Sequence, residues 1–163
     1  MATTDGTPVL TPDGGSVLVT VTPVMETTAL DALDAGHTNS LKLPAMARVA
    51  GGAGMITGAR LIIKDDVGTA LKVHLFTVET TQTADAAFAP SDAQAATYVG
   101  TLDFVTFEDF DTSRVSSLKD VRLAYKCAAA DDALYAVIQV PSGVTPTYPS
   151  ADGNVLVVLA DRY

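Results

Sequence analysis

Two histidines and one cysteine are the side chains of this sequence best suited to nucleophilic or acid–base chemistry. His74 lies in the run "ALKVHLFTV" beside Lys72, and His37 lies in the loop-like run "DAGHTNS". Neither belongs to an H-x-H or H-E-x-x-H arrangement, so their spacing indicates no metal site. Cys127, in "YKCAAA", lies outside any nucleophile signature and is expected to be structural. We interpret His74 as an outward-facing strand residue without a catalytic role.

Carboxylates are the other groups with chemical potential, and they cluster in "FEDFD" (residues 107–111). Paired carboxylates are what glycoside hydrolysis needs, but sugar sites also need aromatic platforms, and the chain has no Trp. The cluster also lacks the spacing of a calcium loop. The Gly-rich run "GGAGMITG" lacks the Lys-Ser/Thr of a phosphate-binding loop. The sequence therefore predicts a non-enzymatic protein with no catalytic residue, no cofactor and no metal, and with "FEDFD" as a solvated turn.

Composition limits the classes of protein that remain. The chain has 163 residues, 48% hydrophobic and 18% charged, which fits one globular domain. Its formal net charge of -9, without a basic cluster, argues against nucleic-acid or anionic-membrane partners. A single cysteine excludes an intrachain disulfide framework and fits a reducing cytoplasm. The first residues do not resemble a secretory signal, and no apolar run approaches the ~20 residues of a membrane-spanning helix.

Alternating apolar residues indicate a series of short strands. The run "SVLVTVTPV" alternates Val17, Val19 and Val21 with Leu18, Thr20 and Thr22, which predicts a strand with one buried face. Further strands are predicted around residues 41–49, 54–64, 71–78, 98–105, 117–126, 133–140 and 154–163. The short run "SDAQAAT" predicts a helix with Ser91 as its N-cap.

The strands around residues 54–64 and 71–78 are separated only by residues 65–69, which predicts a hairpin. The residues expected on the inner faces of these two strands are Met55, Thr57, Ala59, Leu61, Ile63, Leu71, Val73 and Leu75. Eight or nine strands divided by Gly, Pro and Asp turns predict an all-β antiparallel sandwich, with a jelly roll favoured over an immunoglobulin-like alternative. We expect one sandwich domain over residues 16–163, preceded by an extended arm over residues 1–15.

The long run over residues 79–97 interrupts the strand pattern, and long loops in compact domains are often functional. Phe88 and Pro90 are its only bulky residues, so they either contact a partner or pin the loop to its own sandwich. Tyr98 and Tyr148 are expected to be exposed loop aromatics. Candidate partner-contact residues are accordingly Val9 and Leu10 in the arm, Phe88 and Pro90 in the loop, and Tyr98 and Tyr148.

Two long runs carry a resemblance to a known group. They are "ARLIIKDDVGTALKVHLFTVETTQTADAAFAPSDAQAATYVGTLDF" and "LYAVIQVPSGVTPTYPSADGNVLVVLA". Together they resemble small structural proteins encoded beside the capsid genes of tailed bacteriophages, over residues 59–159. The run "TPTYPSADGN" departs from the group, where an Ala before Pro-Thr-Tyr is expected. The shared motifs are structural, so no functional residue is carried over.

The resemblance implies a jelly-roll head decoration or cement protein. Such a protein binds across neighbouring subunits of the phage major capsid protein and is made in the host cytoplasm before it joins the capsid surface. A homo-oligomer, dimer or trimer, is the expected state, because symmetric copies add their weak contacts. The alternative is a receptor-binding or carbohydrate-binding sandwich on the virion, which exposed loop aromatics favour.

Overall fold

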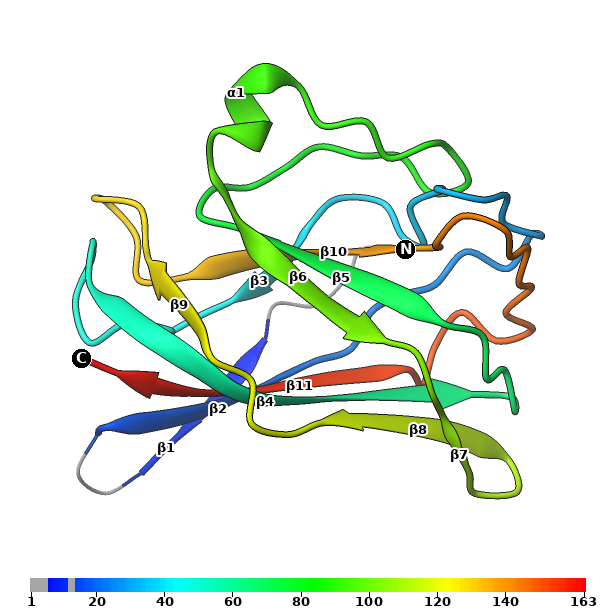
Figure 1. Cartoon of the computed structure of the whole chain (residues 1–163), viewed down its shortest axis with the longest axis horizontal. Helices are drawn as coiled ribbons and strands as arrows, with labels where there is room; N and C mark the ends of the chain where they lie inside the picture. The colour runs from blue at the N-terminus through cyan, green and yellow to red at the C-terminus, as the bar shows by residue number, and fades with distance from the viewer. Residues whose placement is uncertain (1–5, 12–13) are drawn as a thin grey trace.

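The computed structural model describes residues 6–11 and 14–163, which form an all-β fold of two stacked antiparallel sheets (Figure 1). The elements in chain order are β1 (Thr7–Leu10), β2 (Ser16–Val21), β3 (Leu41–Leu43), β4 (Ala53–Lys64), β5 (Leu71–Phe76), α1 (Asp92–Ala95), β6 (Tyr98–Phe104), β7 (Glu108–Asp109), β8 (Ser113–Leu118), β9 (Leu123–Lys126), β10 (Leu134–Gln139) and β11 (Val155–Arg162). The predicted antiparallel sandwich is confirmed.

The order of strands identifies the sandwich as a jelly roll. One sheet has the order β1-β2-β11-β4-β8-β7, with β9 also paired to β4, and the other has the order β3-β10-β5-β6. Antiparallel partners are nested along the chain: β2 with β11, β3 with β10, β4 with β8, and β5 with β6. A long ribbon of paired strands rolled onto itself has this pattern, which distinguishes a jelly roll from the immunoglobulin-like alternative.

Aliphatic side chains from both sheets fill the space between them. In β2, Val17, Val19 and Val21 are at most 1% exposed, so the predicted alternation is confirmed there. Leu71 and Val73 in β5, from the other sheet, belong to the same continuous core. The chain has no Trp. Most of this packed volume is therefore supplied by Val, Leu and Ile.

Strand β4 contains an irregularity that the alternation did not predict. Its pairing with β11 shifts between Leu159 and Ala160, so that Leu159 lies opposite Gly58 while Ala160 lies opposite Ile56. Thr57 is the extra residue, and a β-bulge of this kind reverses the facing of the residues before it. Ile56 is therefore fully buried, and the expectation that Met55 and Thr57 face the core is wrong.

The predicted hairpin between β4 and β5 is also wrong. The two strands belong to different sheets, β4 pairing with β11 and β8, and β5 pairing with β10 and β6. The turn at Asp65 and Asp66, both with positive φ, carries the chain from one sheet to the other. A short connection predicts neighbouring strands, but it serves equally well to cross between stacked sheets at a corner of the roll.

Two other predicted strands are shorter than expected. The strand around residues 41–49 is limited to Leu41–Leu43, because Pro44 follows and Ala45 has a φ of 56°. The strand predicted over residues 117–126 divides into β8 and β9, with Asp120 at a φ of 55° between them. Both parts pair with β4, and the division lies beside the bulge at Thr57.

The segment predicted as an extended arm lies partly in the sheet. Residues Thr7–Leu10 form the edge strand β1 against β2, with Val9 opposite Leu18, while residues 1–5 and 12–13 of the expected arm lie outside the described residues. Pro8 has no backbone N–H to donate. The bond from Thr11 N to Ser16 O shows that in β1 the odd-numbered residues direct their backbone N–H and C=O groups toward β2, and the even-numbered residues direct theirs away from it. Pro8 therefore faces outward, where it discourages a further strand from joining this edge.

Candidate functional site

The long loop between β5 and β6 folds back over the outer face of the β3-β10-β5-β6 sheet, carrying α1 (Figure 1). Backbone bonds hold it against the segment before β3: Ala35 N donates to Ala86 O at 3.0 Å and Phe88 N donates to Leu33 O at 3.0 Å. At α1 the predicted N-cap Ser91 is confirmed, as part of a capping box. The loop is thus a fixed cover on the sheet.

Four ring side chains meet beneath this loop. The ring centroids of His74 and Phe88 are 5.8 Å apart and those of His74 and Tyr98 are 6.2 Å apart. Phe76 completes the set, 6.0 Å from Phe88 and 5.6 Å from Tyr98. They surround a pocket of about 310 Å³, which we call the ring pocket and which is lined by His74, Phe76, Phe88, Pro90, Ala95, Tyr98 and Gln139.

A directed chain of hydrogen bonds fixes the polar groups of the ring pocket. Gln139 Nε2 donates to Leu33 O at 2.9 Å, so its Oε1 faces His74 and accepts from His74 Nε2 at 2.7 Å. His74 Nδ1 is then the acceptor, and Thr101 Oγ1 donates to it at 3.0 Å. Thr101 in turn accepts from the hydroxyl of Tyr98. Both nitrogens of His74 are satisfied inside the protein.

Burial sets the charge state of His74. Desolvation lowers its pKa from the usual value, and the bond to Gln139 opposes this only in part. The ring is therefore neutral at neutral pH, and the pocket presents ring faces with polar groups already paired. Such a lining suits an uncharged apolar or ring-bearing group, and a neutral His74 bonded on both sides is not arranged as a free base.

The structure brings together three of the residues expected to contact a partner. Phe88 is half-buried, Pro90 is exposed and Tyr98 is 48% exposed, and all three line the ring pocket. Phe88 also pins the loop to the sheet, so both interpretations of this residue are compatible with its position. Tyr148 is only 1% exposed and belongs to the core, so the expectation of an exposed aromatic is wrong there.

Val9 and Leu10 lie away from the ring pocket, on edge strand β1 of the other sheet. They are 61% and 51% exposed, as expected for contact candidates. Their side chains point to opposite faces, because Val9 pairs with exposed Leu18 whereas Leu10 pairs with buried Val17.

Sequence reasoning did not assign His74 and Gln139 to any site. His74 does face outward from β5, as predicted, but the loop covers it and leaves it half-buried. Gln139 ends a nearly continuous apolar strand and is 8% exposed. One signal in the sequence could have indicated this site. Two strands close to a long loop each carry a polar residue among apolar ones.

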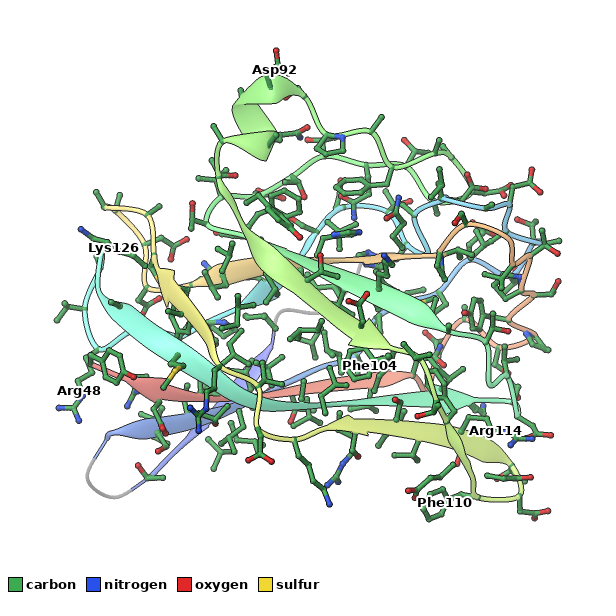
Figure 2. All side chains as sticks on the ribbon, viewed as in Figure 1. Arg48, Asp92, Phe104, Phe110, Arg114 and Lys126 are labelled. Atoms are coloured by element: carbon green, nitrogen blue, oxygen red, sulfur yellow. The ribbon has the colours of Figure 1, made fainter. Side chains whose placement is uncertain are left out.

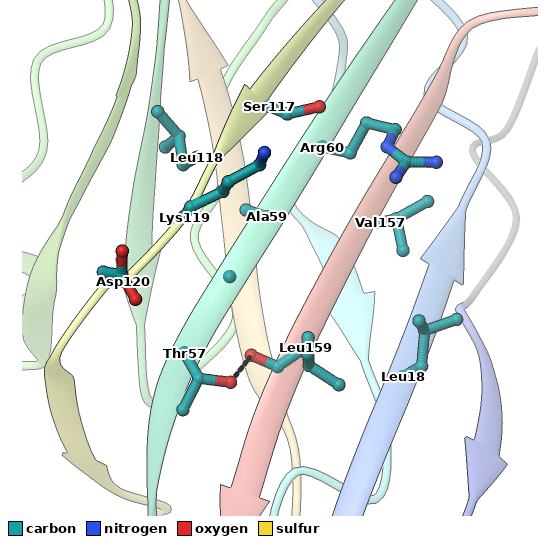
Figure 3. A pocket seen from close by; sticks show the side chains of 11 residues that line it. Leu18, Thr57, Ala59, Arg60, Ser117, Leu118, Lys119, Asp120, Val157 and Leu159 are labelled. Atoms are coloured by element: carbon teal, nitrogen blue, oxygen red, sulfur yellow. Dashed lines mark hydrogen bonds between the residues drawn. The ribbon is translucent and has the colours of Figure 1, made fainter.

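A second hollow lies on the outer face of the larger sheet, where β8 separates from β4 beside the bulge (Figure 3). Its volume is about 330 Å³, and we call it the sheet groove. It is lined by Leu18, Thr57, Gly58, Ala59, Arg60, Ser117, Leu118, Lys119, Asp120, Val157 and Leu159. The missing side chain of Gly58 leaves its floor open, since a Cβ there would stand 3.3 Å from Leu118 O.

The remaining candidates from the sequence have structural positions. Cys127 is 4% exposed, and burial raises the pKa of its thiol to about 11, so the thiolate is disfavoured. Residues 107–111 run into the β7–β8 turn, where Glu108 and Phe110 are exposed. Among the described residues, no group of three or more His, Cys, Asp or Glu side chains could hold a metal ion.

Neither the protein-family models nor the curated proteins compared with this chain give a match. Among solved structures, the chain is similar to the one described as the crystal structure of infectious bursal disease virus VP2 subviral particle, at 11% sequence identity and a TM-score of 0.21. The match covers 97% of this chain and 42% of the other, so this chain spans less than half the length of that protein. Because likeness at this level carries no argument, the fold assignment rests on the strand order.

In the described part of the chain, no helix is long and apolar enough to cross a membrane. The helix that is present, α1, has four residues.

Proposed function

We propose that this chain is a non-enzymatic structural protein of a tailed-bacteriophage virion. It decorates or cements the capsid surface by binding across neighbouring subunits of the major capsid protein. The observation that carries this proposal is the ring pocket, in which Phe88, Pro90 and Tyr98 meet. The resemblance of residues 59–159 to capsid-associated phage proteins supports the capsid as the proposed partner.

The physical chemistry of the ring pocket supports a binding role. Its loop is already held by backbone bonds such as that from Phe88 N to Leu33 O, so little conformational entropy is lost when a partner docks. An apolar side chain of a capsid subunit that enters the pocket gains contact with the ring faces. It leaves no polar group of His74 without a hydrogen bond, because both ring nitrogens are already bonded within the protein. Many symmetric copies on one shell multiply a weak single contact.

A receptor-binding or carbohydrate-binding module on the virion is the second candidate, and the position of Tyr98 favours it. The ring of Tyr98 is 48% exposed at the pocket, and its hydroxyl oxygen retains an acceptor site beside Thr101. An exposed ring next to a hydroxyl can stack on a sugar and accept a hydrogen bond from it.

Co-sedimentation with phage heads that lack this protein tests the capsid proposal. Tyr98→Ala is expected to weaken binding by about tenfold, the loss of a central ring contact. Val49→Ala is the matched control, since Val49 is 66% exposed outside the pocket, and it should bind like the parent. Full binding by the Tyr98→Ala variant would count against the ring pocket as the capsid contact.

Tyr98→Phe separates the two candidates. This variant keeps the ring and removes only the hydroxyl. Capsid docking through apolar contact should survive it, whereas glycan binding that uses the hydroxyl should fall. Binding of the parent protein to a glycan array, with loss of that binding in Tyr98→Phe and no co-sedimentation of either protein with heads, would favour the carbohydrate module.

A further inference from the structure

The sheet groove combines apolar walls with two cationic side chains. Leu18 and Leu159, which pair across β2 and β11, are 38% and 40% exposed along its side. Arg60 reaches from β4 toward Val157 of β11 and Lys119 lies over β4, both at the other end of the groove from Leu18 and Leu159, with Asp120 set apart on the side away from β11 (Figure 3). Within the described residues, neither Arg60 nor Lys119 forms an ion pair. On a chain with a net charge of -9, this is a local site for an acidic and apolar group.

The same chain carries a segment with the complementary character at the turn between β7 and β8. Phe110 is 57% exposed at this turn and projects away from the sandwich (Figure 2). We call residues 108–111 the Phe110 turn, in which Glu108, Asp109 and Asp111 flank Phe110 in the sequence. Glu108 and Asp111 make no ion pair in the part of the chain that the structure describes.

Hydrogen bonds hold the Phe110 turn in one shape. Asp109 Oδ1 accepts from the backbone N–H of Asp111 at 2.9 Å, and Phe110 N donates to Ser113 O at 2.9 Å. Arg114 Nη2 lies 3.3 Å from the other oxygen of Asp109, which fixes that carboxylate from β8. An exposed aromatic ring on a rigid support loses little conformational entropy when a partner binds it.

The turn and the groove lie at opposite ends of β8, so one molecule cannot join them. The Phe110 turn precedes Ser113, the first residue of β8, and Leu118, its last residue, lines the groove. Five residue steps at about 3.3 Å each separate these ends by roughly 17 Å. The ring of Phe110 can therefore enter the groove only of another molecule.

We propose that the Phe110 turn of one copy docks into the sheet groove of a second copy. In this contact Phe110 packs against Leu18 and Leu159, and Glu108 and Asp111 of one copy approach Arg60 and Lys119 of the next. Because two different surfaces meet, the contact is heterologous and propagates head to tail, as a closed ring or an open chain. This self-association is a property of the purified protein and does not depend on the capsid partner proposed above.

Sedimentation velocity of the purified chain over a range of concentrations tests the contact. The runs use physiological ionic strength, where a Debye length of about 8 Å screens the overall repulsion between acidic copies. The parent protein should form concentration-dependent oligomers. Phe110→Ser should weaken that association by about tenfold or more, the loss of an aromatic anchor. Val105→Ser is the matched control, since Val105 is 67% exposed outside both surfaces, and it should associate like the parent.

A charge exchange makes the test specific to the two surfaces. The groove variant Arg60→Glu/Lys119→Glu and the turn variant Glu108→Lys/Asp111→Lys should each be monomeric alone. An equal mixture should associate, because the acidic groove of one variant then faces the basic turn of the other. Asp111 has a φ of 68°, so a thermal melt checks that the turn variant folds; if it does not, Phe110→Ser carries the test.

Three results would overturn the inference: a parent protein that stays monomeric at every concentration, parent-like association of Phe110→Ser, or failure of two folded exchange variants to associate when mixed. Head co-sedimentation of Phe110→Ser separates this inference from the capsid proposal. Loss of self-association with retained head binding leaves the capsid proposal intact. If the parent protein self-associates but does not bind heads, the contact between copies is supported and the capsid proposal is contradicted.

Discussion

His37 Nε2 accepts a hydrogen bond from the backbone N–H of Ile138 at 3.0 Å, which makes an imidazole ring part of the bonding pattern of β10. A backbone amide can only donate, so Nε2 is unprotonated, and Nδ1 donates to Asn39 O at 2.7 Å. The ring lies beside the end of β10 that β3 does not pair with, since β3 begins at Leu41, opposite Ala136. His37 is fully buried, so this bond requires the neutral ring.

The free energy of unfolding should decrease as the pH is lowered, because of His37. Burial lowers the pKa of its ring from 6.5 to about 4, so the unfolded chain takes up a proton at a pH where the folded chain does not. The contribution of the neutral ring is fully present above pH 6.5 and is lost as the pH falls from there to about 4. The full difference is about 3 kcal/mol of unfolding free energy. Urea unfolding at a series of pH values from 7.5 to 4 measures it.

Titration by NMR provides the residue-specific control for that prediction. The ring of His37 should keep its neutral chemical shifts through pH 5. His74, whose pKa is also lowered by burial, changes stability in the same direction, so His74→Ala is made to isolate the part that belongs to His37. Protonation of His37 near pH 6.5 in the folded protein would contradict the prediction.

Gly54 lies where β4 passes closest to its neighbours. A Cβ at this position would stand 2.3 Å from the hydroxyl of Tyr125 and 2.6 Å from Asp161 O. The hydroxyl cannot easily move, because it donates to Met46 O at 2.6 Å. Gly54→Ala should therefore cost about 1–3 kcal/mol through overpacking. Gly68→Ala, where the nearest atom is Cδ of Arg114 at 3.5 Å, an ordinary van der Waals distance, is the matched control and should be nearly neutral in the same denaturant titration.

Cys127 should react slowly with thiol reagents in the folded protein. Its pKa of about 11, against a usual value of 9.0, lowers the thiolate fraction at pH 8 by about 100-fold, and burial restricts access further. Reaction with a chromogenic disulfide should therefore be fast in urea and slow without it. Rapid labelling of the native chain would show that the end of β9 opens often.

Alternation of side chains was enough to predict the sandwich and most of its strands. In β2, and in β5 as far as Leu75, every second residue is buried, so the period of two holds there; in β5 it ends at Phe76, which is also buried and where the pairing with β6 shifts register. It failed at Thr57 because a bulge depends on how β4 meets β11, which is a property of two strands distant in sequence. The false hairpin at residues 65–69 has a similar cause, since a jelly roll alternates sheets at turns that look local.

The candidate sites show the same division between local and long-range information. Phe88 and Pro90 could be selected because a long loop with few bulky residues makes each one conspicuous, and Tyr98 because the chain has few aromatic residues. Gln139 could not be selected, because only the pairing of β10 with β5 brings it beside His74. The sheet groove depends on residues of several strands and on the break between β8 and β9, which the alternation treated as one strand.

The facing of edge strand β1 gives the last prediction. Val9 is 61% exposed and lies opposite Leu18, whereas Val19, one position further along β2, is fully buried in the core. Val→Thr keeps the shape of the side chain and replaces one methyl group by a hydroxyl, which costs about 1–3 kcal/mol where no hydrogen-bond partner is available. Val19→Thr should therefore lower the unfolding free energy by about that amount, and Val9→Thr should change it by less than about 0.5 kcal/mol. Urea titration of the two variants measures both. Equal losses would show that Val9 packs inward in solution, so that β1 would be a core strand and not an exposed edge available for contact.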